Sequence, residues 1–219
     1  MIWTLLLAHF LGDFPLQPDW MVRRKRELGM LALHAGVHFV LMILLVGKIR
    51  SFIWPHILVL SGFHLIQDCS KIVLTDRWPQ QRVFLFFLDQ LLHFAAIWGL
   101  FAWISASFPN IDTVAKPLWA IIGIAYLVST YAWYISERVI HMDDSSFLQN
   151  IEATKFPRIL VRSGLVSLFW LVRAWDGAGL ALAILSPYPA TEFRKRAILS
   201  DFGVSLAVIL FLFLTLGTS

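Results

Sequence analysis

Long apolar runs, separated by charged or proline-bearing breaks, alternate along most of the 219-residue chain. A run of about 18 residues or more is long enough to cross a hydrocarbon core of roughly 30 Å as a helix. Helices are expected here because they satisfy their own backbone hydrogen bonds in lipid. The pattern predicts spanning segments at about Leu28–Val46, Phe52–Leu74, Val83–Ser107, Pro117–Ser136 and Ala197–Leu216.

Two stretches depart from this simple pattern. Ile2–Phe14 is apolar but short, and the two prolines that follow exclude a regular helix, so we expect a short helix broken at Pro15 and Pro18 that leads into a re-entrant or interfacial turn. Ile159–Ser186 is too long for one untilted pass; one long kinked helix or a helical hairpin would fit, and we favour the helix. The expected fold is an all-α, polytopic transmembrane bundle of about six to seven membrane segments. The polar stretch at 141–157 is expected to be a loop with at most one interfacial turn.

Composition agrees with a membrane protein. Hydrophobic residues make up 58% of the chain and charged residues 15%, whereas a soluble domain has about 25% charged residues. The single cysteine, Cys69, excludes an internal disulfide and a CxxC metal pair. Residues 1–13 have no basic stretch before them and no small-residue cleavage site after them, so we do not expect a removed signal peptide.

Four of the apolar segments each carry two polar residues spaced four apart. At 3.6 residues per turn, the two side chains of each pair lie on one helix face, which is the spacing that two ligands need to bind one ion from a single helix. Histidine and carboxylate are suitable ligands for zinc, manganese or iron. The pairs are His9 with Asp13, His34 with His38, His64 with Asp68, and Asp89 with His93.

The four pairs also share a depth in the bilayer. Clusters of Lys and Arg follow the first, third and fifth segments, which places the loop Arg23–Arg26 in the cytoplasm. At 1.5 Å per residue, all four pairs then lie within roughly 5–17 Å of the cytoplasmic helix ends. Residues 1–219 are therefore expected to form a single membrane domain, in which 1–107 is the metal-site half and 108–219 is a supporting helical half.

The pairs have three possible explanations: a metal site, a metal-free proton or ion relay, and plain packing. Intramembrane ionisable residues are costly, which makes them functional candidates, and four pairs matched in depth favour the metal site. Eight ligand-type groups exceed the four of an ordinary zinc site. They fit a dinuclear site, or one divalent ion, zinc first and manganese or iron as alternatives, with carboxylates that orient the histidines.

Other polar residues are weaker candidates. Gln17, Gln67 and Gln90 flank the pairs and could hold water or substrate. Arg23 and Arg24 either fix the topology and contact anionic lipid head groups, or attract a phosphate-bearing substrate. In the second half, Arg162, Arg173 and Asp176 are expected to form a buried ion pair or to reach the interface. His56 and His141 lie outside the depth band and are interpreted as loop or interface residues.

At these positions the chain resembles the DUF3307 family of bacterial integral membrane proteins, whose function is unknown. The resemblance covers about residues 5–95 and is carried by short blocks at 9–17, 33–38, 64–68 and 88–93. It implies a fold type, a residue set and a bacterial inner membrane location, but no activity. A looser likeness to membrane-bound metal-dependent hydrolases is analogy at the level of the fold.

The leading functional hypothesis is a metal-dependent hydrolase that acts on an amphiphilic, lipid-like substrate near the cytoplasmic face. The eight paired residues would ligate the metal, which lowers the pKa of a bound water towards 7, and one of Asp13, Asp68 and Asp89 would act as general base. A di-metal oxidoreductase of the desaturase or hydroxylase type, and a cation- or proton-coupled transporter, are the alternatives. The expected partners are membrane lipids and the substrate, with no nucleic acid.

Overall fold

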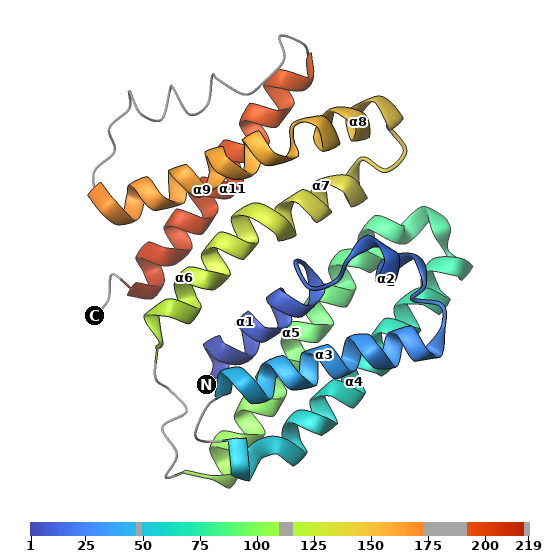
Figure 1. The fold of residues 1–219 in the computed structure, drawn as a ribbon, viewed down its shortest axis with the longest axis vertical. Coiled ribbons are helices and arrows are strands. Elements are labelled where there is room, and N and C mark those ends of the chain that lie inside the picture. The colour runs from blue at the N-terminus through green and yellow to red at the C-terminus, as the bar shows by residue number, and fades with distance from the viewer. Residues whose placement is uncertain (47–49, 110–115, 173–191, 217–219) are drawn as a thin grey trace. The chain divides into compact units, whose positions relative to one another are not determined.

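The computed structural model describes residues 1–46, 50–109, 116–172 and 192–216 (Figure 1). The helices found in these ranges divide between two compact units, Met1–Ile121 and Ile122–Ser219. Five helical stretches are long and apolar enough to cross a membrane: Leu28–Val46, Phe52–Arg77, Pro79–Ser107, Leu118–Ile140 and Lys195–Leu216. The prediction of an all-α membrane fold is thereby confirmed, whereas the count of six to seven segments stays a prediction.

The first unit is built from α1 (Ile2–Asp13), α2 (Asp19–Arg23), α3 (Leu28–Val46), α4 (Arg50–Arg77) and α5 (Arg82–Ser107). Helix α1 packs against α3 and α5, and α4 packs against α3 and α5, so these four helices surround a common interior (Figure 1). The chain leaves the helical path between α1 and α2, where Pro15 and Pro18 stand. Proline lacks the backbone N–H that a helix needs at this point.

Helices α3, α4 and α5 each turn one narrow stripe of residues towards the interior, whereas α1 is buried on most of its surface. Positions three or four apart recur on that stripe because the helix has 3.6 residues per turn. On α4 the buried positions are Ile53, Ile57, Leu60, Ser61, His64 and Asp68, and on α5 they are Leu85, Asp89, His93, Ile97, Leu100 and Ile104. The interior therefore has an aliphatic end, filled by isoleucine and leucine, and a polar end, filled by histidine and aspartate.

The second unit begins within α6 (Leu118–Leu127), which continues through a π-helical turn, η3 (Val128–Ala132), into α7 (Trp133–Ile140). Helix α9 (Lys155–Val172) packs against η3 and against α11 (Glu192–Leu216), and α11 also contacts η3. At η3 the hydroxyl groups of Ser129 and Thr130 both donate to the carbonyl of Tyr126. The π-helical turn, a feature frequent at functional or strained positions, thus lies where three helices meet.

The stretch 141–157 is not the predicted loop, because it holds a further helix, α8 (Ser145–Ala153). Asp144 caps that helix by accepting a hydrogen bond from the backbone N–H of Phe147 at 2.9 Å, and this bond lowers the pKa of the Asp144 carboxyl. Polar composition alone favours a loop, whereas the cap and the buried Phe147 and Ile151 stabilise a short amphipathic helix.

Candidate metal centre

All four predicted pairs meet at the polar end of the first unit. The five histidines and two of the aspartates, Asp68 and Asp89, are at most 4% exposed, and the Asp13 side chain is 9% exposed. His38 and His64 have ring centroids 3.9 Å apart, and those of His64 and His93 are 4.3 Å apart. Four helices thus bring the eight groups into one buried cluster.

Asp13, at the end of α1, lies at the centre of the cluster. Its Oδ1 atom is 3.0 Å from His38 Nε2, 3.2 Å from His34 Nε2 and 3.8 Å from His64 Nε2. Its Oδ2 atom is 3.6 Å from His9 Nε2. One carboxylate therefore faces histidines from three helices, which is possible because the broken path after residue 13 ends α1 inside the bundle.

Three groups of side chains have ligand atoms that all lie within 4.8 Å of one another, close enough to hold a metal ion. The groups are His9, Asp13, His38 and His64; His34, His64 and Asp68; and Asp68, Asp89 and His93. His64 and Asp68 each belong to two groups. Shared ligands of this kind suit neighbouring ions in one site, as in two-metal centres.

Several imidazole nitrogens in the cluster have no hydrogen-bond partner within the described part of the chain. They are both ring nitrogens of His9, Nδ1 of His38, and Nε2 of His64 and of His93. A buried polar atom without a partner is costly, and such atoms in a native protein call for an explanation such as an ion. Neutral imidazole nitrogens beside carboxylates are the donor set that zinc, manganese or iron binds, so these residues fit a metal.

His93 is oriented for this role by its own helix. Its Nδ1–H donates to the backbone carbonyl of Asp89 at 2.8 Å. A histidine that donates through one nitrogen offers the other as the lone pair for a metal, and such bonds commonly fix the ring of a metal ligand. The unpartnered Nε2 is then the nitrogen available for coordination.

Gly12 explains why the rings approach so closely. A Cβ atom built on this residue would lie 2.5 Å from both Cε1 and Nε2 of the His38 ring. Any larger residue at position 12 would therefore displace that ring. The glycine is therefore part of the geometry of the cluster, and sequence reasoning did not single it out.

Two of the three flanking glutamines contact the cluster. Gln90 Nε2 donates to Asp13 Oδ2 at 3.1 Å. The Gln17 amide oxygen, in the orientation that satisfies its neighbours, accepts from His34 at 3.1 Å and from Lys25 Nζ at 2.6 Å. Gln67 Oε1 is buried and has no hydrogen-bond partner among the described residues.

The arginines predicted to serve the site lie outside the cluster. Arg23 is exposed, and Arg24 forms a two-bond ion pair with Glu27 at 2.7 and 2.9 Å on the surface. Two lysines, which the sequence analysis did not name as site residues, lie in the site instead. Lys25 Nζ is 2.9 Å from Asp68 Oδ2, and Lys71 Nζ is 2.7 Å from Asp89 Oδ2. Lys71 could have been predicted as a site residue, because it lies three residues after Asp68 and therefore on the same helix face.

The remaining predicted polar residues lie in other surroundings. The His56 ring packs 4.5 Å from Trp103, and the His141 ring packs 4.0 Å from Phe147. Arg162 is buried in the second unit and pairs with Asp201, whereas Arg173 and Asp176 lie outside the described residues. Neither His56 nor His141 belongs to the cluster.

The fold and this cluster define a class: a helical membrane-type protein with buried histidine and aspartate groups that could bind metal. Residues 1–122 match the family described as "Protein of unknown function (DUF3307)". The chain therefore belongs to the DUF3307 family, and the matched region contains every residue of the cluster. Comparisons with curated proteins and with solved structures gave no match.

Proposed function

We propose that this protein is a membrane-embedded, metal-dependent hydrolase. The observation that carries the proposal is the convergence of unpartnered imidazole nitrogens with three carboxylates in a buried site. A divalent ion in this site would make water nucleophilic at neutral pH. A carboxylate left outside the coordination sphere would accept the proton from that water.

Asp89 is the best placed of the three carboxylates to act as the base. Asp13 is surrounded by histidines, and Asp68 belongs to two of the three ligand groups. Asp89 belongs to one group only, at the edge of the cluster, and is held there by Lys71. A base at the edge of a metal site can exchange its proton with the aqueous end of the bundle.

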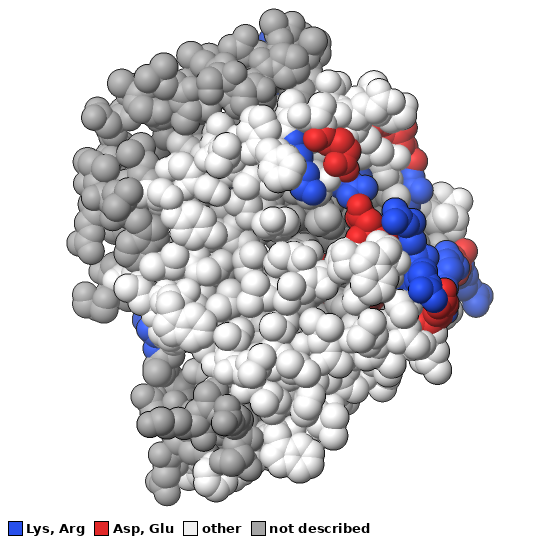
Figure 2. Space-filling model, in the orientation of Figure 1, with Lys and Arg blue, Asp and Glu red and all other residues white. Residues whose placement is uncertain are grey.

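The location proposed for the site is the cytoplasmic side of a bacterial inner membrane. Most basic residues of the first unit lie in the segment before α3, at the end of α4 and at the start of α5, and by the distribution of Lys and Arg we propose that this end faces the cytoplasm. Figure 2 shows charged atoms gathered near the end of the first unit where α2 lies, while the sides of its helices are mostly uncharged. A substrate would reach the site from the membrane interface.

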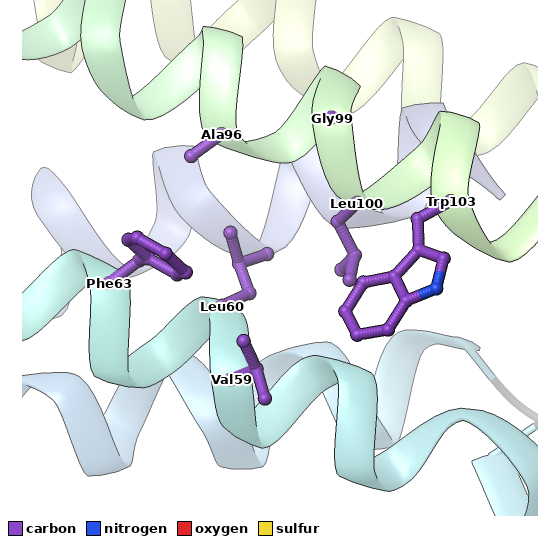
Figure 3. Close-up of a pocket in the computed structure, with 7 residues that line it drawn as sticks. All are labelled: Val59, Leu60, Phe63, Ala96, Gly99, Leu100 and Trp103. Carbon is purple, nitrogen blue, oxygen red and sulfur yellow. The ribbon is translucent and has the colours of Figure 1, made fainter.

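An amphiphilic substrate is supported by an apolar groove beside the cluster. The groove lies between α4 and α5, has a volume of about 250 Å³, and is lined by Val59, Leu60, Phe63, Ala96, Gly99, Leu100 and Trp103 (Figure 3). Leu60 is one helical turn from His64, and Ala96 is one turn from His93. We propose that the acyl chain of the substrate occupies this groove while its scissile group lies at the cluster.

Metal analysis of the purified protein tests whether the cluster binds metal, as the proposed hydrolysis requires. Zinc or manganese in fixed stoichiometry is expected, and His38→Ala and Asp68→Ala should each strip the metal while the protein still inserts. His56→Ala is the matched control, because His56 is a histidine of α4 outside the cluster. The His56→Ala protein should bind as much metal as the wild type. Two irons with visible absorbance would instead indicate an oxidoreductase. If both cluster variants kept the metal content of the wild type, His38 and Asp68 would not be metal ligands.

The groove is tested by a pair of glycine variants. Gly99 lines the groove and Gly62 does not, yet both are exposed and an added Cβ meets nothing within 4 Å at either position. Gly99→Leu should therefore reduce labelling of the protein by a photoactivatable acyl-chain phospholipid in nanodiscs, and Gly62→Leu should not. Equal labelling of both variants and the wild type would exclude the groove as a chain-binding site.

A further inference from the structure

Two lysines are unexpected features of a metal site, because they compete with metal for the same carboxylates. Lys25 comes from the short segment after α2, and Lys71 comes from α4. Their side chains are only 17% and 26% exposed, and each ammonium group is within hydrogen-bond distance of an aspartate that also belongs to a metal group. Packing alone does not require a cation at either place.

The charges of the site show what the lysines add. With neutral imidazoles, the form that binds metal, the three carboxylates and two lysines leave one net negative charge. One divalent ion would change the net charge of the site to +1, and two ions would change it to +3. A buried excess of positive charge is costly unless an anion compensates it.

Metal binding would also release Lys25 from Asp68, which belongs to two of the ligand groups, whereas Lys71 would stay beside Asp89, the proposed base. A carboxylate that coordinates a metal is a poorer acceptor for an ammonium group, because the ion already draws on its charge. The two Nζ atoms would then remain at the edge of the site, each with three N–H donors. Lysine is a compact point charge that commonly binds phosphate oxygens.

We infer that Lys25 and Lys71 form an anion-binding side of the metal centre, and that the substrate is a phosphate ester. This inference rests on the proposed metal-dependent hydrolysis. In the reaction, the oxygen of water bonds to phosphorus, the ester P–O bond breaks, and the leaving oxygen takes up a proton. The lysines compensate the charge of the phosphoryl oxygens, which a phosphate ester carries already when it binds, whereas amide and carboxylic ester substrates bind as neutral groups.

Inorganic phosphate is the probe, and the zinc-loaded full-length protein in detergent is the sample. Isothermal titration calorimetry should show saturable phosphate binding that is lost when zinc is removed. Lys25→Gln and Lys71→Gln should each weaken phosphate binding by about tenfold, the size expected for one charge-assisted hydrogen bond, and each should retain its zinc. Lys71→Arg keeps the positive charge and should restore most of the affinity.

Arg26→Gln is the control, because Arg26 adjoins Lys25 in sequence but pairs with Asp76 on the surface. It should bind phosphate as the wild type does. Unchanged phosphate binding in the Lys25→Gln, Lys71→Gln double variant would overturn the inference and leave the metal centre intact. Loss of zinc from the single lysine variants would also overturn it, because the lysines would then be structural. A wild type that holds no metal would overturn the proposed function and the inference together.

Discussion

The two units both bury charged side chains among apolar helices, but they treat those charges differently. In the second unit, Arg158 binds both oxygens of Asp201 at 2.6 and 2.9 Å and Glu137 at 2.7 Å, and Arg162 binds Asp201 at 3.0 Å. All four residues are at most 3% exposed. Two cations and two anions thus form a network in which opposite charges face one another directly.

The first unit instead buries histidines of which five ring nitrogens have no hydrogen-bond partner among the described residues. Burial by itself therefore does not distinguish a structural site from a functional one. The distinction lies in whether each buried charged group directly faces a group of opposite charge. Bidentate pairing of Arg158 with Asp201 indicates a fold-stabilising network, and the unpartnered nitrogens of the cluster indicate a site that is completed by a ligand.

The electrostatics of Arg158 agree with a structural role. Burial acts to lower the pKa of its guanidinium, but the hydrogen bonds and charges of Asp201 and Glu137 outweigh burial and hold that pKa above its ordinary value. The side chain therefore stays charged at every accessible pH. A group that never changes its protonation state is suited to holding helices together rather than to moving protons.

The largest effect is expected from removing that arginine. Arg158→Met leaves Asp201 and Glu137 buried without their main partner, and it should lower the free energy of unfolding by about 3–5 kcal/mol. Unfolding in detergent, followed by circular dichroism, measures the change. Arg138→Met is the matched control in the same unit, because Arg138 faces Glu152 in an exposed pair 3.2 Å long, for which less than about 1 kcal/mol is expected. Equal effects of both variants would contradict the structural role of the buried network.

Much of the fold follows from hydropathy because a membrane-spanning run is a property of one segment. The predicted Leu28–Val46 has the bounds of α3, and the predicted Val83–Ser107 differs from α5 by one residue at its start. The ends differ more for α11, which begins at Glu192 and not at Ala197. Hydropathy detects the apolar run, whereas the backbone hydrogen bonds of a helix continue through its polar residues.

The gathering of the cluster was predictable for a related reason. Each pair lies on a single helix, so a spacing of four residues places both side chains on one face without any knowledge of the tertiary structure. The roles of Lys25 and Gln17 depend on where the irregular segment around α2 lies, which no local spacing encodes. Likewise, Arg158 and Asp201 are 43 residues apart, and their pairing depends on how α9 packs against α11.

A smaller effect, of opposite sign, is expected from the first unit. His9 is fully buried and neither of its ring nitrogens has a hydrogen-bond partner among the described residues, so its polar atoms destabilise the metal-free fold. His9→Leu should therefore raise the stability of metal-free protein by about 1 kcal/mol, since an apolar side chain of similar size removes that cost.

The same substitution should reduce the stabilisation that zinc provides, because a ligand that binds only the folded state raises Tm by an amount that grows with the logarithm of its affinity. Tm of the metal-free and zinc-loaded forms measures both effects in one experiment. His141→Leu, at a histidine packed on Phe147 outside the cluster, should leave the zinc-dependent rise in Tm unchanged. If His9→Leu instead lowered Tm without metal and kept the full zinc effect, His9 would be a packing residue. The contrast between a cluster of unpartnered imidazoles and a network of directly paired charges would then not hold.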